Sequence, residues 1–523
     1  SYKVPEKWSG VVAYMLDEIP VKKTEKKEEE DTGTNEKKKK EKVKKPSKKN
    51  GYHLIVRNLY NGTEDTLRFV KDYLFSKEGN LLAYTTTGNS DTSKPGVYVL
   101  DVKQHTPQQI FESHEKSSYH QLAFNDKGTY LGFVADTDTT KVKFRPNALY
   151  HWRKGSTAAQ LMVDAQSSPK GYGVSSNGKI TFSEDQTKMY FGLAVPQIEK
   201  DTTLLDEEIV NVEVWTYDEP QLYTVQEMQI KNIQNRSFTA VVQLDTKAMT
   251  QLATTEYPTA QIGNKGNGPF ALLRNPVPYQ LESQWNGERN NDYAVVNITN
   301  GQTRKILSEM PSSFRLSPYN KMVIGYNNTD STWVSYEILT GKKVNLTKGM
   351  PFYDELNDRP MKAGSYGLAG WIGYDDKVLL YDRYDIWEFN PRTGDNRQLT
   401  NGRETKTEYR IVQLDREART LNPDERWLLT SFNETTKKSG YVSFNYKRRK
   451  ATVLMEGDYL LNRPVKAENA DVVMCTRQRF EEFPNIRLTD LTFEEKVQMT
   501  NANPQQRQYN WGTAELVKWT SLD

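Results

Sequence analysis

At 523 residues the chain is long for one ordinary domain, because single hydrophobic cores stop growing beyond roughly 250–300 residues. Its 71 Lys and Arg against 68 Asp and Glu leave a net charge of +3, which gives no support for a nucleic-acid-binding face. No run of about 18 apolar residues predicts a membrane span, and the single cysteine, Cys475, excludes an intramolecular disulfide and a Cys-rich zinc site.

The positive charge is concentrated near the N-terminus. Residues 21–50 carry thirteen lysines and seven acids, so the rest of the chain has a net charge of −3. This run lacks the apolar residues that offset ordering entropy, and it predicts a solvated, flexible Lys-rich loop over residues 18–51. Loose contact with an acidic surface is the alternative. Strand-like residues 11–15 and 54–59 flank the run, which favours a loop over a tail.

One sequence pattern recurs along the chain: an apolar run, a polar turn of about four residues, and a second apolar run. Ser, Asn, Asp and Gly occupy the turns, where they bond to local backbone or tolerate positive φ. Each copy therefore predicts a hairpin. The copies lie at residues 73–84, 122–133, 180–191, 314–324 and 421–429.

A second pattern follows the first and is clearest at residues 385–400, where alternating strands flank Asn390-Pro391-Arg392-Thr393-Gly394. Asn-Gly or Thr-Gly between alternating strands is a strong hairpin signal. Two successive hairpins make a four-stranded antiparallel blade. Relatives of this second pattern occur at residues 96–101, 293–301, 336–347 and 486–491.

The pairs of hairpins predict an all-β protein, a β-propeller in which eight blades are favoured and seven are the alternative. An open β-solenoid with a shorter and more uniform period is the competing architecture. Strands near 10–16 and 52–69 would either join the last blade or form another one. The propeller is expected to span residues 1–510, with blades near 72–111, 118–163, 177–253, 260–306, 312–347, 370–400, 424–455 and 471–500.

No catalytic group can be assembled from the sequence. The serine hydrolase signature G-x-S-x-G and the phosphate-binding signature G-x-x-x-x-G-K-[ST] are both absent. All five histidines (His53, His105, His114, His120 and His151) are interpreted as ordinary surface or blade residues, with metal binding as the alternative. We therefore predict no catalytic residue, metal or cofactor in this chain. Trp152, Trp215, Trp333, Trp371 and Trp387 are predicted mainly to pack within blades.

The C-terminal residues 511–523, from Trp511 to Trp519-Thr520-Ser521-Leu522-Asp523, alternate apolar and polar as a half-buried strand does. Together with residues 212–218 and the blade at 471–500, they resemble bacterial members of the prolyl oligopeptidase and dipeptidyl peptidase IV family of serine peptidases. In that family a β-propeller caps an α/β-hydrolase domain. The resemblance implies that residues 511–523 begin a linker into such a domain, which would supply the Ser-Asp-His triad.

The resemblance implies a substrate filter that admits short peptides and excludes folded proteins. In aminopeptidase-type members a glutamate pair from the propeller captures the free N-terminal amine of the peptide. Glu207 and Glu208, in the long insertion of residues 197–235, are the candidates here, with a solvated acidic helix start as the alternative. Arg145 is the candidate for contact with a substrate carbonyl or carboxylate.

A stand-alone propeller that binds a protein or glycan partner is the alternative function, and a glycosidase propeller is a weaker one. The expected partners are the hydrolase domain and short peptides, with no nucleic acid and no membrane span; homo-oligomerisation is left open. A periplasmic or secreted bacterial location is favoured, with the cytoplasm as the alternative.

Overall fold

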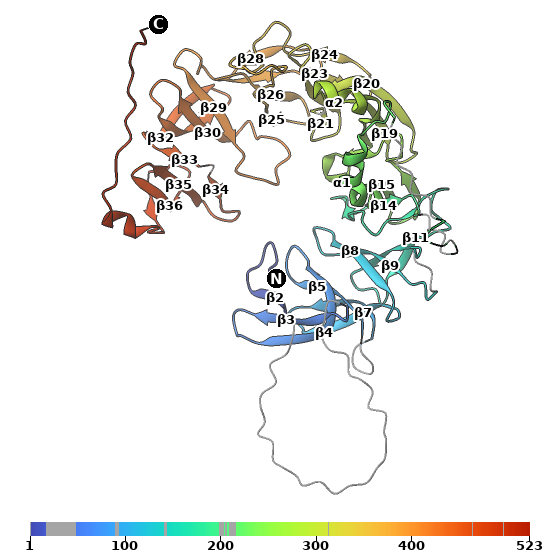
Figure 1. Cartoon of the computed structure of the whole chain (residues 1–523). Coiled ribbons are helices and arrows are strands. Elements are labelled where there is room, and N and C mark those ends of the chain that lie inside the picture. The colour runs from blue at the N-terminus through green and yellow to red at the C-terminus, as the bar shows by residue number, and fades with distance from the viewer. Residues whose placement is uncertain are drawn as a thin grey trace, which may run out of the picture. The chain divides into compact units, whose positions relative to one another are not determined.

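The computed structural model describes residues 2–16, 49–88, 94–140, 144–197, 203, 205, 207–208, 216–311, 313–462, 464–494 and 496–522. Most of the predicted Lys-rich loop and part of the 197–235 insertion, including Trp215, therefore lie outside the described residues. The chain divides into two compact units. We call residues 1–287 with 296–304 the N-terminal unit, and residues 288–295 with 305–523 the C-terminal unit (Figure 1).

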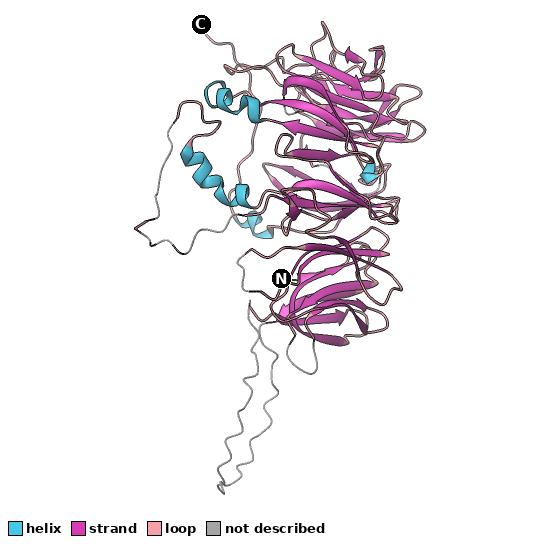
Figure 2. Cartoon of the chain, turned by 90° about the vertical axis from the view of Figure 1, so that its right-hand side faces the viewer, coloured by secondary structure: helices cyan, strands magenta, loops and turns pink. Residues whose placement is uncertain are grey.

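Nearly all regular structure consists of antiparallel strands joined in chain order, with the helices outside the sheets (Figure 2). The first sheet has seven strands in the order β1 to β7. Their bounds are β1 Tyr2–Lys3, β2 Val11–Leu16, β3 Tyr52–Asn58, β4 Glu64–Phe75, β5 Leu81–Thr86, β6 Gly96–Asp101 and β7 Thr106–Glu112.

The long strand β4 belongs to two groups of strands. Its first half pairs with β3 from Arg57↔Glu64 to Tyr52↔Val70, and its second half pairs with β5 from Val70↔Thr86 to Phe75↔Leu82. Phe69 has φ 56°, and both ladders shift register next to it, as expected where a strand bends. The N-terminal strands thus pair with one another and with β4, which agrees with the alternative of a further group of strands and not with pairing to the last blade.

The next three sheets contain four, five and four strands. The second is β8 Ser118–Phe124, β9 Tyr130–Asp136, β10 Ala148–Arg153 and β11 Gln160–Val163. The third is β12 Gly173–Val174, β13 Thr181–Phe182, β14 Lys188–Ala194, β15 Phe238–Gln243 and β16 Met249–Gln251. The fourth is β17 Thr259–Ile262, β18 Phe270–Asn275, β19 Asn290–Asn297 and β20 Thr303–Pro311. The connecting helices are α1 Tyr223–Gln234, η2 Asn264–Gly266, η3 Val277–Tyr279 and α2 Gln280–Asn286.

The last four sheets follow the same order in the C-terminal unit. The fifth is β21 Arg315–Leu316, β22 Met322–Asn327, β23 Thr332–Glu337 and β24 Lys343–Asn345; the sixth is β25 Leu368–Ile372, β26 Lys377–Tyr381, β27 Ile386–Phe389 and β28 Asn396–Gln398. The seventh is β29 Thr407–Val412, β30 Arg426–Asn433, β31 Ser439–Asn445 and β32 Lys450–Gly457. The eighth is β33 Leu460–Leu461, β34 Val465–Lys466, β35 Val473–Arg479, β36 Glu482–Thr489 and β37 Val497–Gln498, followed by the 3₁₀ helix η4 Pro504–Gln508.

Successive sheets pack face to face. On β26, Val378 and Leu380 lie in a core shared with the fifth sheet, whereas Leu379 between them lies in a core shared with the seventh. This alternation follows from the period of two in a strand, and it buries the central strands on both faces. Because each sheet is built from consecutive strands, the β-solenoid alternative is excluded, and the four-stranded antiparallel blade type of a β-propeller is confirmed.

The aromatic side chains predicted to pack within blades do so wherever the structure describes them. Trp152, Trp333 and Trp371 are buried. Trp387 is half-buried against the core of the fifth and sixth sheets and donates a hydrogen bond to Asp382. Cys475 is likewise buried, and desolvation raises the pKa of its thiol.

Two sequence expectations need correction. The seventh sheet begins at Thr407, before the predicted start at 424, because strand β29 carries Glu408 and Arg410 and lacks the apolar run used to find hairpins. Residues 511–522 form no strand and are exposed. Their alternation alone does not suffice, since a strand also needs a partner for its backbone groups, and no described strand pairs with them. Among the described residues no helix is long and apolar enough to cross a membrane.

Candidate functional site

Glu207 and Glu208 lie in a turn and are both exposed. The carboxylate of Glu208 accepts a hydrogen bond from the backbone N–H of Leu205 at 2.9 Å, which closes the turn. The helix α1 begins only at Tyr223, so the two acids are not at a described helix start. Their neighbours 209–215 lie outside the described residues, and the capture of a peptide amine remains a prediction.

Arg145 is half-buried and holds three chain segments together. Its Nη1 donates to Lys116 O at 2.9 Å, to Asp136 Oδ2 at 3.1 Å and to Asp138 O at 3.2 Å. Hydrogen bonds to Thr140 lower the pKa of the Asp138 carboxyl. Among the described residues no contact joins Arg145 to either glutamate, so the structure does not bring the three predicted site residues together.

The histidines are distributed over separate sites within the N-terminal unit. His53 and His151 are buried, and desolvation lowers the pKa of both rings and of His120. His105 pairs with Asp65 at the surface. In the part of the chain that the structure describes, no group of His, Cys, Asp and Glu is arranged to hold a metal ion.

A cavity of about 690 Å³ lies in the N-terminal unit, where strands β4, β8 and β13 of three successive sheets meet. Strand β8 contacts both β4 and β13 there. The volume falls within the range of about 300–1,000 Å³ that is typical of ligand pockets. The wall is mixed, with apolar side chains, a backbone edge and two charged groups. It is formed by Leu74, Gln121, Leu122, Ala123, Phe124, Asn125, Asp126, Lys179, Ile180, Thr181 and Phe182.

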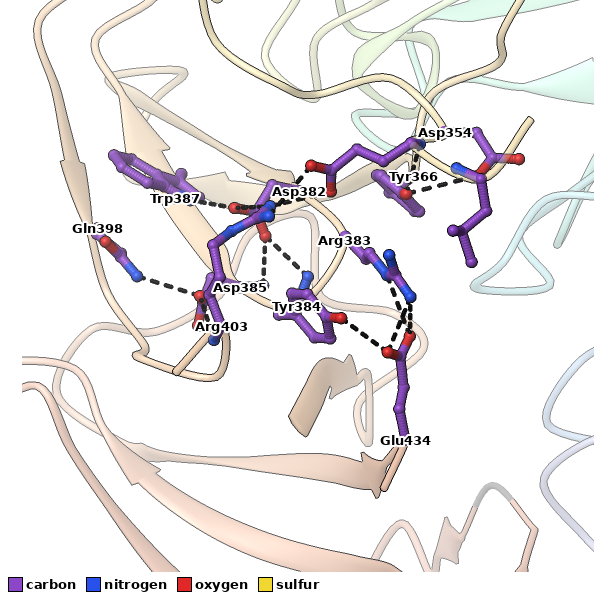
Figure 3. A network of polar contacts seen from close by, with 12 residues as sticks. Asp354, Tyr366, Asp382, Arg383, Tyr384, Asp385, Trp387, Gln398, Arg403 and Glu434 are labelled. Carbon is purple, nitrogen blue, oxygen red and sulfur yellow. Dashed lines mark hydrogen bonds and ion pairs between the residues drawn. The ribbon is translucent and has the colours of Figure 1, made fainter. Parts of the chain in front are cut away.

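A dense polar network lies in the C-terminal unit, around the turn that joins β26 to β27. Figure 3 shows Arg383 and Tyr384 pointing at Glu434, which follows β30 in the next sheet. The guanidinium makes three contacts with the carboxylate at 2.8–3.1 Å, and Tyr384 Oη donates to it at 2.7 Å. A planar guanidinium matches a carboxylate in such a pair, so the two sheets are held in register.

The other half of the network is organised by two buried acids of the same turn. Asp385 accepts hydrogen bonds from Thr400 Oγ1, Gly402 N and the Arg403 backbone at 2.5–3.1 Å. Arg403 then reaches Asp382 at 3.3 Å (Figure 3). It also pairs with Glu355 through two hydrogen bonds of 3.1 Å.

The environment of the network also shifts the pKa values of two of its members, Tyr384 and Asp385. Desolvation, followed by the hydrogen bond to Glu434, raises the pKa of Tyr384 to about 12. Desolvation raises the pKa of Asp385 and exceeds the opposing effect of its donors. The carboxylates of Glu434 and Asp385 already have donors on both oxygens, so these groups position the loops and do not form a reactive pair. The only sequence signal for this network is the unusual Asp382-Arg383-Tyr384-Asp385 turn, which no motif distinguishes as a site.

No family model and no curated protein sequence matches this chain. Solved structures similar to it include one of two prolyl endopeptidases studied for inter-domain dynamics in catalysis and specificity, at 11% identity and a TM-score of 0.29, covering 83% of this chain and 55% of that chain. Dipeptidyl peptidase 4 of Porphyromonas gingivalis matches at 10% identity and a TM-score of 0.37, covering 88% and 59%. The β-propeller domain of the trilobed protease from Pyrococcus furiosus matches at 11% identity and a TM-score of 0.25, covering 96% and 98%. The chain thus spans less than two thirds of the first two proteins, and the likeness is too distant to assign an activity.

Proposed function

We propose that this chain is the non-catalytic, substrate-gating β-propeller part of a serine peptidase of the prolyl oligopeptidase type, which acts on short peptides. The observation that carries the proposal is the cavity between strands β4, β8 and β13. It offers a backbone edge and mixed apolar and charged walls, which suit an extended peptide. A space of about 690 Å³ cannot accept a folded protein.

Charged groups at other places in the propeller would orient the peptide. Glu207 and Glu208 are exposed, and a carboxylate pair opposite an ammonium forms a charge-assisted hydrogen-bonded contact. Arg145 uses one nitrogen of its guanidinium for its three contacts, and its side chain is 23% exposed, so its other donors can reach a substrate oxygen. The peptidase domain, a periplasmic location and a bacterial source belong to the same proposal.

The test is an assay of the protein as its gene encodes it, with peptide amides of two to thirty residues and with a folded protein as substrates. We expect rapid hydrolysis of the short peptides and none of the folded protein. A folded protein that hydrolyses no peptide would exclude the peptidase and favour a scaffold that binds a protein or glycan. Equal hydrolysis of peptides and folded protein would exclude the gate.

The amine-binding role is tested separately with Glu207→Gln and Glu208→Gln in that protein. We expect KM for a free-amine peptide to rise at least about tenfold, since charge-assisted hydrogen bonds contribute about 1.5–3 kcal/mol. KM for the same peptide with an acetylated N-terminus should not change. Asp218→Asn, at an exposed acid of the same insertion, is the matched control.

A further inference from the structure

The first strand of the third sheet is interrupted where it faces the cavity. β12 and β13 both pair with β14, at Val174↔Leu193 and Phe182↔Met189, while residues 176–180 between them leave the edge of the sheet. Gly178 and Gly192 allow this segment to cross β14 closely, because a Cβ on Gly192 would overlap Gly178 Cα and Ser237 Oγ. The interruption leaves open space beside the neighbouring strand β8.

The strand β8 is also interrupted, at the same cavity. Its ladder with β9 runs from Ser118 to His120 and resumes only at Ala123, so Gln121 and Leu122 have no partner in β9. Gln121 has φ 58°, which is unfavourable for a residue with a side chain. Its side-chain amide donates to Ser176 O in the interrupted segment at 3.0 Å, and this bond holds the bulge open. Such bulges commonly re-aim side chains next to binding sites.

The chemistry of the wall indicates what would fill this space. Among the described strands β8 pairs only with β9, so its other edge offers backbone groups that no described strand pairs with. Asp126 and Lys179 line the cavity with opposite charges, and neither makes an ion pair with another described residue. A short peptide in extended conformation supplies the matching backbone groups together with a free amine and a free carboxylate.

We propose that a short peptide with free termini binds in this cavity as an added strand along the free edge of β8, at Gln121 and Leu122, with Asp126 and Lys179 facing its charged ends. The inference rests on the proposed peptide-handling function and names the place where the peptide binds before hydrolysis. It concerns binding by this chain alone and needs no hydrolysis.

The first experiment compares two probes by calorimetric titration of this chain. One is the pentapeptide Ala-Val-Thr-Val-Ala with free termini, and the other is the same peptide with alternate backbone nitrogens methylated. Methylation removes backbone donors and leaves the side chains unchanged. We expect the methylated peptide to bind at least about tenfold more weakly, because one or two hydrogen bonds are lost. Equal affinity, or no binding of either peptide, would overturn the proposal.

The second experiment places the peptide. Leu122→Pro removes an amide donor from the free edge without deleting a rung of the β8–β9 ladder, and it should weaken binding of the unmethylated peptide about tenfold. Asp126→Asn should weaken it severalfold, and only when the peptide amine is free. Lys127→Gln is the matched control, since Lys127 is exposed next to Asp126 and does not line the cavity. Near-ultraviolet circular dichroism checks that each variant is folded.

If Leu122→Pro does not fold, Asp126→Asn and the methylated peptide still decide the question, because neither changes the backbone of the protein. If the folded Leu122→Pro variant and the Asp126→Asn variant both bind the peptide with undiminished affinity, the proposed position would be overturned. Peptide binding at β8 in a protein that hydrolyses nothing would leave this inference standing and overturn the peptidase. If the protein hydrolyses peptides and its Leu122→Pro and Asp126→Asn variants bind the pentapeptide normally, this inference would be overturned and the peptidase would stand.

Discussion

In the N-terminal unit the turns of the second and third sheets are joined by a neutral amide, whereas in the C-terminal unit the turns of the fifth and sixth sheets are joined by a buried carboxylate. Gln186 Oε1 accepts from Asn125 Nδ2 and Thr129 Oγ1 at 3.0 and 2.6 Å. At the corresponding junction of the fifth and sixth sheets, Asp375 is fully buried and accepts from Ser317 Oγ and from the backbone of Tyr319 and Lys321 at 2.5–3.2 Å. The same hairpin turns thus meet through different chemistry.

The two units also differ in how neighbouring sheets meet, with a cavity between sheets in one unit and ion pairs between sheets in the other. The N-terminal unit has interrupted first strands and a cavity, while the C-terminal unit ties sheets together with Arg–carboxylate pairs such as Arg383–Glu434 and Arg392–Glu337. Charged pairs demand a fixed geometry, so they suit a supporting wall. A region that admits a ligand needs unpaired backbone edges. We infer that the same four-stranded sheet forms a rigid support in the C-terminal unit and admits a ligand in the N-terminal unit.

The largest effect is expected from Asp375→Ala. This change leaves two backbone donors and the Ser317 hydroxyl without their acceptor in a buried turn, at a cost of about 3 kcal/mol or more. Urea unfolding should show the loss, and hydrogen exchange should rise in residues 317–322. Asp376→Ala is the control, because the neighbouring Asp376 is exposed and should change the free energy of unfolding by less than about 0.5 kcal/mol. Equal effects of the two changes would contradict the role given to Asp375.

Gly192→Ala should have the next largest effect. The new methyl group would overlap Gly178 Cα and Ser237 Oγ, so the crossing beside the cavity must shift, at a cost of about 2 kcal/mol. The free energy of unfolding and peptide affinity should fall together. Gly173→Ala, in the same sheet, meets nothing within 4 Å and should leave both unchanged. A stable Gly192→Ala with normal peptide affinity would show that the crossing does not shape the cavity.

Glu434→Gln tests the Arg383–Glu434 pair through the pH dependence of the free energy of unfolding. Burial opposes ionisation of Glu434, but hydrogen bonds from Tyr384 and Arg383 outweigh it and lower its pKa below the ordinary 4.5. The ionised form therefore stabilises the fold above about pH 4.5, and this contribution disappears as the pH falls through the lowered pKa. We expect the variant to be about 1–2 kcal/mol less stable near pH 7. The two unfolding curves should converge in acid, and a constant difference at all pH values would contradict the assignment.

Gln186→Ala should have the smallest effect, about 1 kcal/mol, because it removes neutral hydrogen bonds near the surface. The loss of stability relative to the unaltered protein should be the same at all pH values, in contrast to that of Glu434→Gln. Hydrogen exchange in the turn 125–129 reports the change directly. A loss as large as that of Asp375→Ala would mean that the two kinds of junction are equivalent.

Much of the fold could be predicted from local patterns. Four of the five hairpin repeats, at residues 73–84, 122–133, 180–191 and 314–324, correspond to adjacent antiparallel strands, and the turn at residues 390–394 joins β27 to β28 as expected. The repeat predicted at 421–429 is wrong, because Leu421 forms an isolated parallel bridge with Ile372 and β30 pairs with β29. β29 was missed because Thr407–Val412 carries Glu408 and Arg410 on a half-buried strand, where pairing with β30 overrides composition. The strand predicted at 511–522 fails for the opposite reason: its pattern is right, and no described partner is present.

The candidate sites were less predictable. Residue type identified Glu207, Glu208 and Arg145, yet the structure uses Arg145 to bind Asp136 and two backbone carbonyls. The cavity residues Gln121 and Lys179 are unremarkable in sequence. They become a site only because β8, β12 and β13 are interrupted at the same place.

By itself the sequence determined the strand period, the tight turns and hence a chain of antiparallel sheets, because these depend on residues close together along the chain. Tertiary structure alone decided which turns meet, through Gln186 in one unit and Asp375 in the other, and where the first strands open into a cavity. Those choices depend on contacts between residues far apart in the chain, such as Asn125 with Gln186, 61 positions apart, and Ser317 with Asp375, 58 positions apart. The physical reason is that local periodicity specifies which face of a strand is buried, whereas side-chain fit across sheets specifies the partner.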